Sequence, residues 1–214
     1  MTDLDLCQLA NSVYDNPNVQ CGIASALVTE LDGIQVFAFA GSKDTEDFLF
    51  DAYAIPASMD GLGHVHKGFR DEYFMLREKL LELAQDSLLP KIMIGHSLGG
   101  PQAQFCAWDF GRIMKVLPPV TFGCPKGFTD EALVNYTVGS KNYIHGQDIV
   151  PDLPGYFHRP GTDIFLDETG KLLPSREPCE SLLDEIRDRI MDHLLLGQGY
   201  LEAVGNYLKN LTSN

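Results

Sequence analysis

The sequence contains few basic side chains for its acidity, with 16 Lys and Arg against 30 Asp and Glu among 214 residues. The resulting formal net charge of −14 should repel nucleic-acid phosphates and anionic membrane surfaces. No apolar run approaches the length needed to span a bilayer, and the first residues are acidic where a signal peptide would be basic. We therefore expect no nucleic-acid partner and no stable membrane insertion. The sequence predicts a cytoplasmic protein, unless it is released by a route that needs no signal peptide.

Disulfide and metal signals are also missing. The five cysteines are odd in number, dispersed, and without the C-x-x-C spacing of zinc or redox sites. His64 and His66 have the i, i+2 spacing of some metal ligands, but no third ligand cluster accompanies them. The sequence therefore predicts free thiols and no metal site.

The length, together with a hydrophobic content of 44%, is sufficient for one domain, 1–214, with a substantial core. Strand-like and helix-like segments alternate in its second half, which is typical of a sheet with parallel strands. Strands are predicted at residues 23–30, 34–40, 92–94, 116–122, 141–145, 164–166 and 172–173. Helices are predicted at residues 4–14, 69–87, 101–114, 130–136, 180–191 and 199–211. Between residues 43 and 63 the periodicity fades and acidic residues mix with aromatic ones, which we interpret as a loop or lid over a site.

Two short motifs predict where elements begin and turn. Thr2 and Asp5 have the spacing of a capping box at the start of the first helix. Asp32-Gly33 is a strong signal for a hairpin turn between the first two strands. Residues 34–40 are apolar at nearly every position, so this strand should be central and covered on both faces.

The stretch 91–100, which reads K-I-M-I-G-H-S-L-G-G, contains the candidate nucleophile. A run of strand length leads into a Gly-His-Ser-Leu-Gly turn, and a helix-compatible segment follows. Such a turn would hold Ser97 in a strained backbone conformation with its hydroxyl exposed, and the flanking glycines would remove colliding Cβ atoms. The alternative is a glycine-rich turn that only packs a helix close to a sheet.

A serine hydroxyl needs a general base, which a carboxylate holds in the right tautomer. In α/β-hydrolases the acid and then the histidine follow the serine in the chain, on loops beyond the carboxyl ends of parallel strands. Asp148 follows the strand 141–145 and is the best candidate acid, with Asp152 second. His193 is the candidate base because of its place in this order, although a histidine at a helix end is the simpler interpretation of its surroundings.

The other histidines near these positions are weaker candidates. His145 lies too near the acid, and His158 precedes a turn. His96 could line the site or pack beneath the nucleophile turn. An oxyanion also needs fixed donors, for which the N–H of Leu98 and the end of the strand 34–40, at Ser42, are the candidates. The alternative for Ser42 is an ordinary turn at a strand end.

Several blocks together resemble the class 3 (fungal-type) triacylglycerol lipase family. These blocks are F-A-G-S at 39–42, H-K-G-F at 66–69, G-H-S-L-G-G at 95–100, T-F-G-C-P at 121–125, H-G-Q-D-I-V-P at 145–151 and D-H at 192–193. They follow the family's order across most of the chain. The resemblance implies an α/β-hydrolase-type three-layer sandwich, with a mostly parallel central sheet and helices on both faces. It also implies a nucleophile, acid and base at Ser97, Asp148 and His193, and an oxyanion hole at Ser42 and Leu98.

The function implied by the resemblance is that of a serine carboxylester hydrolase. It would form an acyl-enzyme at Ser97 from an acylglycerol or another ester or lipid substrate, with no metal or organic cofactor. The alternatives are an inactive binding protein of the same fold, and an acyltransferase, phospholipase or peptidase with the same triad. The charged segment 43–47, K-D-T-E-D, and the missing disulfide pattern differ from the secreted lipases. These differences argue against activation at oil surfaces and leave ester hydrolysis unaffected.

Overall fold

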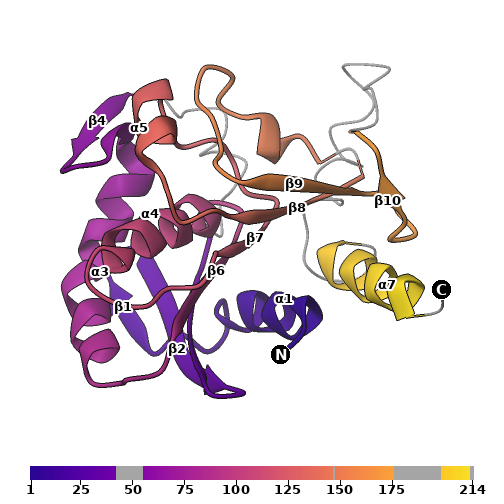
Figure 1. Cartoon of the computed structure of the whole chain (residues 1–214), viewed down its shortest axis with the longest axis horizontal. Coiled ribbons are helices and arrows are strands. Elements are labelled where there is room, and N and C mark those ends of the chain that lie inside the picture. The colour runs from indigo at the N-terminus through magenta and orange to yellow at the C-terminus, as the bar shows by residue number, and fades with distance from the viewer. Residues whose placement is uncertain (42–54, 147, 176–198, 213–214) are drawn as a thin grey trace.

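A mixed sheet forms the centre of the molecule (Figure 1). The computed structural model describes residues 1–41, 55–146, 148–175 and 199–212. Within these residues eight strands form the sheet, in the order β1-β2-β3-β6-β7-β8-β9-β10. They are β1 (Val19–Cys21), β2 (Ala24–Leu31), β3 (Ile34–Phe39), β6 (Lys91–His96), β7 (Val120–Phe122), β8 (Lys141–His145), β9 (Thr162–Leu166) and β10 (Leu172–Leu173). Pairing is parallel from β3 to β9 and antiparallel at both edges, so the central sheet is mostly parallel as predicted.

Helices cover both faces of this sheet. One face packs against α3 (Lys67–Gln85) and α4 (Gly99–Gly111), and the other packs against α1 (Asp3–Ser12) and α7 (Tyr200–Thr212) (Figure 1). The short helices α5 (Asp130–Asn135) and η1 (Val150–Asp152) lie in the connections after β7 and β8. The predicted arrangement of three layers is therefore confirmed.

Local signals placed several elements correctly. At the start of α1 the Thr2 hydroxyl accepts a hydrogen bond from the Asp5 N–H at 3.2 Å, and the Asp5 carboxylate accepts one from the Thr2 N–H at 2.6 Å. This is the predicted capping box. Between β2 and β3, Asp32 and Gly33 have positive φ angles of 51° and 74°, which the tight hairpin turn requires. Every residue of β3 after the first is buried, so the prediction of a central strand is confirmed.

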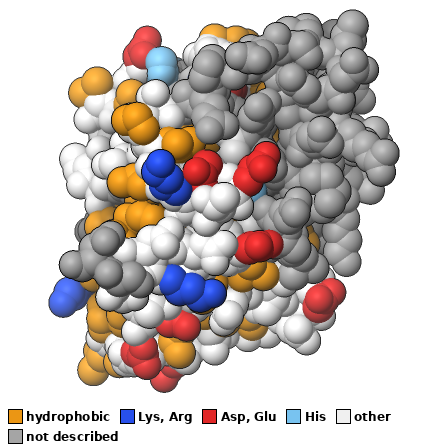
Figure 2. Space-filling view, turned by 90° about the vertical axis from the view of Figure 1, so that its right-hand side faces the viewer, with side chains coloured by type: hydrophobic (Ala, Val, Ile, Leu, Met, Phe, Trp, Pro, Cys, Tyr) orange, Lys and Arg blue, Asp and Glu red, His pale blue; other side chains and the backbone are white. Residues whose placement is uncertain are grey.

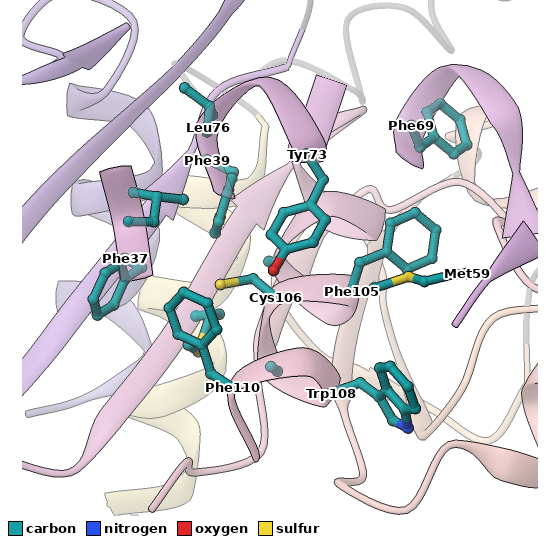
Figure 3. Close-up of a cluster of buried hydrophobic side chains, with 14 of the residues drawn as sticks. Phe37, Phe39, Met59, Phe69, Tyr73, Leu76, Phe105, Cys106, Trp108 and Phe110 are labelled. Carbon is teal, nitrogen blue, oxygen red and sulfur yellow. The ribbon is translucent and has the colours of Figure 1, made fainter. Parts of the chain in front are cut away.

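The larger hydrophobic core lies between the sheet and the pair α3 and α4. Figure 3 shows aromatic side chains from β3, α3 and α4 meeting there, among them Phe37, Tyr73 and Phe110. The Tyr73 hydroxyl is satisfied within this core because it donates to Asp109 Oδ2 at 2.6 Å. A second core, on the opposite face, joins α1 and α7 to the sheet. The two cores fix the sheet from both sides, and with it the loops at the strand ends.

Three strands were not expected from the sequence pattern. The short strand β1 pairs with β2 at the sheet edge. The strands β4 (Pro56–Met59) and β5 (Gly63–His66) form a separate hairpin, and β4 lies within the segment 43–63 that we predicted as a loop or lid. They are short and their burial does not alternate regularly, so periodicity could not indicate them. Residues 43–54 of that predicted lid, and the predicted helix 180–191, lie outside the described residues.

The surface combines acidic, basic and hydrophobic side chains. On the face shown in Figure 2, acidic side chains are spread among hydrophobic and basic ones. Some of the basic groups are neutralised by neighbouring acids, as Arg77 is by Asp109 at 2.6 Å. None of the helices that the structure describes is long and apolar enough to cross a membrane.

Candidate active site

Ser97 lies in the sharp turn that joins β6 to α4, as predicted. Its φ angle is +54°, in the left-handed region that residues other than glycine rarely adopt. The glycines on either side leave no room for a side chain. A Cβ at Gly95 would lie 2.2 Å from the Gly99 carbonyl oxygen, and a Cβ at Gly99 would lie 2.2 Å from the Phe39 carbonyl oxygen. Close packing of the helix on the sheet therefore requires these glycines, and the serine between them is strained.

The prediction that the Ser97 hydroxyl is exposed was wrong. Ser97 is 0% exposed, because the end of the neighbouring strand packs against it. A Cβ placed on Gly41 would lie 2.9 Å from the Ser97 Cβ. Within the described part of the chain, no group forms a hydrogen bond with Ser97 Oγ. A buried hydroxyl without a partner costs stability, and such exceptions in folded proteins call for a functional explanation.

Leu98 stands directly before α4 as its N-cap residue, and its side chain is fully buried. The first N–H groups of a helix have no carbonyl partner within the helix. They also lie at the positive end of the helix dipole. The geometry therefore makes the Leu98 N–H suitable for an oxyanion that forms next to Ser97 Oγ.

Asp148 is fully buried in the loop that follows β8. Its Oδ2 atom accepts a hydrogen bond from the Tyr200 hydroxyl at 2.5 Å, and its Oδ1 atom accepts one from the Val150 N–H at 2.9 Å. Burial and then the charge of Asp148 raise the pKa of Tyr200 well above its ordinary value, so its hydroxyl stays protonated and donates. Asp152, the second candidate acid, is exposed in η1. The buried and oriented carboxylate of Asp148 is the better acid on geometry.

Tyr200 connects Asp148 to the turn that carries Ser97. Its ring makes an edge contact with His96, the neighbour of Ser97, with ring centroids 6.0 Å apart. Its hydroxyl oxygen also accepts a hydrogen bond from the backbone N–H of His145 at 3.3 Å. The sequence analysis did not select Tyr200, because a tyrosine within a helix-like segment carries no signal of a distant carboxylate.

Three other described histidines pair with acids or stack on an aromatic ring. His64 pairs with Glu131 at 2.9 Å, and His158 pairs with Asp130 at 2.8 Å. His66 stacks on Phe69 in a buried position, where burial lowers its pKa to about 4. No three His, Cys, Asp or Glu side chains gather as metal ligands among the residues that are described.

Ser42 and His193 lie outside the described residues, so their parts in the site stay predictions. The strand that leads to Ser42 can be followed as far as Gly41. Phe39, the last residue of β3, pairs with Gly95 of β6. The chain therefore leaves β3 beside the turn that carries Ser97.

Arg159 is a further residue that the sequence analysis did not select. Its side chain is only 5% exposed. One guanidinium nitrogen donates to the Cys124 carbonyl oxygen at 2.7 Å and to the Pro151 carbonyl oxygen at 2.6 Å. The other two nitrogens donate to the Asp163 carboxylate at 3.1 and 2.7 Å. Arg159 therefore ties the loop after β7 to the loop that carries Asp148.

A buried polar network continues from Asp163 beneath α4. Asn142 Nδ2 donates to Asp163 Oδ1 at 3.0 Å and to the Pro160 carbonyl oxygen at 2.9 Å. Its Oδ1 atom accepts from side chains of Gln104 at 3.1 Å, Thr121 at 2.9 Å and Ser140 at 2.8 Å. Gln104 belongs to α4, so the network links the helix that follows Ser97 to three parallel strands.

The chain is similar in sequence and in fold to known lipases. The family described as Lipase (class 3) matches residues 36–158, which is more than half of the chain. A lipase from Rhizomucor miehei is 31% identical over 140 residues, which are 56% of this chain and 38% of that protein. The match therefore spans little more than a third of that relative's length.

Solved lipase structures share the fold. The complex of Rhizomucor miehei lipase with its propeptide has a TM-score of 0.73 at 20% identity, covering 94% of this chain and 79% of the other. A triacylglycerol lipase whose catalytic centre is formed by a serine protease triad has a TM-score of 0.63 at 21% identity, covering 77% of this chain and 79% of the other. These similarities show the predicted α/β-hydrolase-type fold. Together with the match to the family, they place the chain in the class 3 lipase family.

Proposed function

We propose that this protein is a serine carboxylester hydrolase of lipase type. Ser97 is the nucleophile, Asp148 the acid and His193 the base, while the N–H of Leu98 and the strand end at Ser42 form the oxyanion hole. Two observations on Ser97 carry this proposal. Its backbone has a φ angle of +54°, and its buried hydroxyl has no hydrogen-bond partner among the described groups. A turn that served only to pack the helix would need neither the strain nor a buried hydroxyl that no described group satisfies.

The proposed reaction proceeds through an acyl-enzyme. Ser97 Oγ forms a bond with the carbonyl carbon of the ester, while His193 takes the serine proton and transfers it to the departing alcohol oxygen. A water molecule, deprotonated by the same histidine, then attacks the acyl carbon and releases the carboxylic acid. The serine recovers its proton. These steps require no metal or organic cofactor.

The surroundings of Asp148 support its part in this mechanism. An acid that orients the imidazole and stabilises the imidazolium must stay ionised and correctly oriented. The Tyr200 hydroxyl donates to one carboxylate oxygen of Asp148 and the Val150 N–H donates to the other, which fixes the plane of the group. The related triacylglycerol lipase, with its serine protease triad, supports the same chemistry and a substrate of the acylglycerol or carboxylic ester class.

Turnover of p-nitrophenyl butyrate tests the proposal. We expect Ser97→Ala to lower kcat by ~10⁴-fold or more, because a triad that acts as a unit loses most of its rate with the nucleophile. Ser25→Ala, in β2, is the matched control and should retain full activity. A fluorophosphonate probe should label the wild-type protein and not Ser97→Ala. Equal turnover by wild type and Ser97→Ala would refute the proposal, and absent turnover and labelling in the wild type would indicate an inactive binding protein.

A further inference from the structure

The hydroxyl of Tyr14 joins two segments of the proposed site. Tyr14 follows α1, whose packing on the sheet brings the hydroxyl to the ends of β3 and β6. The Gly41 N–H donates to the Tyr14 oxygen at 3.1 Å, and His96 Nδ1 lies 2.9 Å from the same oxygen. Gly41 directly precedes Ser42, and His96 directly precedes Ser97. One side chain from the first helix therefore contacts the neighbours of both proposed functional residues.

The chemistry of the Tyr14 hydroxyl allows it to bond to Gly41 and His96 at the same time. A backbone N–H can only donate, so the Tyr14 oxygen accepts from Gly41. The hydroxyl donates its proton to His96 Nδ1 when the histidine proton is on Nε2, and its oxygen accepts from Nδ1–H in the other tautomer. Either direction joins the two groups. Burial raises the pKa of Tyr14 to about 12, so the hydroxyl keeps this proton at neutral pH.

The backbone ladder alone does not hold Gly41 in place. The last pair between β3 and β6 is Phe39 with Gly95, two residues before Gly41. The Ala40 N–H then bonds to the Ser25 carbonyl oxygen in β2. Beyond that point, the Gly41 N–H donates to the side chain of Tyr14. Tyr14 thus continues, through a side chain, the connection between two strands whose backbone pairing has ended.

Gly41 is closely surrounded by Tyr14 and the turn at Ser97, so there is little space for it to move. A Cβ on Gly41 would lie 2.8 Å from the Tyr14 hydroxyl oxygen and 3.0 Å from the His96 carbonyl oxygen. The Tyr14 and His96 rings also meet edge to face, with centroids 6.0 Å apart. A displacement of Gly41 would therefore be transmitted directly to the turn that carries Ser97. Catalytic groups must be held within about 0.5 Å of productive geometry.

We propose that Tyr14 is a positioning residue for oxyanion stabilisation. By holding Gly41 to His96, its hydroxyl sets the separation between the end of β3 and the nucleophile, and so the fit of the oxyanion hole to the tetrahedral intermediate. Tyr14 does not touch the reacting atoms in this scheme. The inference rests on the proposed function, because it takes the chain after β3, at Ser42, as part of the oxyanion hole.

The test compares Tyr14→Phe with the wild type in p-nitrophenyl butyrate turnover. The phenylalanine keeps the ring packing and removes only the hydroxyl. We expect kcat to fall ~10- to 100-fold with KM changed less than twofold, because a misplaced oxyanion hole weakens transition-state binding and leaves ground-state binding intact. Tyr207→Phe, in the same core, is the matched control, because its ring packs against Tyr143. It should keep the wild-type kcat.

The outcomes separate this inference from the proposed function. If Ser97→Ala abolishes turnover but Tyr14→Phe keeps the wild-type kcat, the positioning role is refuted and the function stands. If Ser97→Ala retains turnover, the proposed function itself is refuted. A rise in KM at unchanged kcat, or a Tyr14→Phe protein that is unfolded by circular dichroism at the assay temperature, would assign Tyr14 a binding or structural role and overturn the inference.

Discussion

Glu72 should make the stability of this protein depend on pH. It belongs to α3, and its Oε2 atom accepts a hydrogen bond from Gln102 Nε2 of α4 at 2.6 Å. Burial raises the pKa of the Glu72 carboxyl from 4.5 to about 7, and the hydrogen bond from Gln102 opposes this rise only in part. Gln102 is fully buried in the first turn of α4, so a charge on Glu72 is placed beside the helix that follows Ser97.

The sign follows from proton binding in the two states. Between pH 4.5 and about 7 the folded protein keeps the Glu72 proton, whereas the unfolded chain has lost it. The free energy of unfolding therefore falls as pH rises through this window, and the loss is complete above it. At ~1.36 kcal/mol for each pH unit between the two pKa values, the largest possible loss is ~3.4 kcal/mol. Partial contact with solvent reduces the expected loss to ~1–3 kcal/mol.

Urea denaturation from pH 4 to pH 8 measures this effect in the wild type and in Glu72→Gln. The glutamine has the same shape, accepts from Gln102 and cannot ionise. We expect the two free energies of unfolding to agree near pH 4 and to separate by ~1–3 kcal/mol in favour of Glu72→Gln at pH 8. Taking the difference between the proteins removes the pH dependence that arises from the overall charge.

Glu78→Gln is the matched control on the same helix. The side chain of Glu78 is 79% exposed and pairs with Arg77 at the surface. Its substitution should change the free energy of unfolding by less than ~1 kcal/mol. Parallel curves for wild type and Glu72→Gln from pH 4 to pH 8 would refute the reasoning from burial.

Two further substitutions test the support of the proposed site. Tyr200→Phe removes a charge-assisted donor from Asp148, so we expect kcat for p-nitrophenyl butyrate to fall ~10-fold or more; an unchanged kcat in a folded protein would contradict a role for Tyr200 in orienting the acid. Asn142→Ala leaves buried donors of Gln104 and Thr121 without their shared acceptor, so the free energy of unfolding in urea should fall by ~3 kcal/mol or more. A loss below ~1 kcal/mol would show that the network is not a stabilising unit.

Local chemistry made much of the fold predictable. The capping box of Thr2 and Asp5 and the Asp32-Gly33 turn act between residues that are close in the chain, so their consequences can be derived from spacing. The turn at Ser97 is of the same kind, because neighbouring glycines permit its backbone and the flanking apolar runs specify a strand and a helix. β4 was missed because a four-residue strand has no periodicity to detect.

The sequence by itself determined most of the elements in their order, the strand, turn and helix around Ser97, and the candidates for the acid and base. Tertiary structure alone decided that Ser97 is buried, because that depends on how closely Gly41 packs against it. It also decided which side chains support the site. The bond between Tyr14 and His96 spans 82 positions and that between Asp148 and Tyr200 spans 52, and no local pattern encodes such a meeting. These contacts exist because α1 and α7 pack on the same face of the sheet, which brings a tyrosine from each end of the chain to the ends of its central strands.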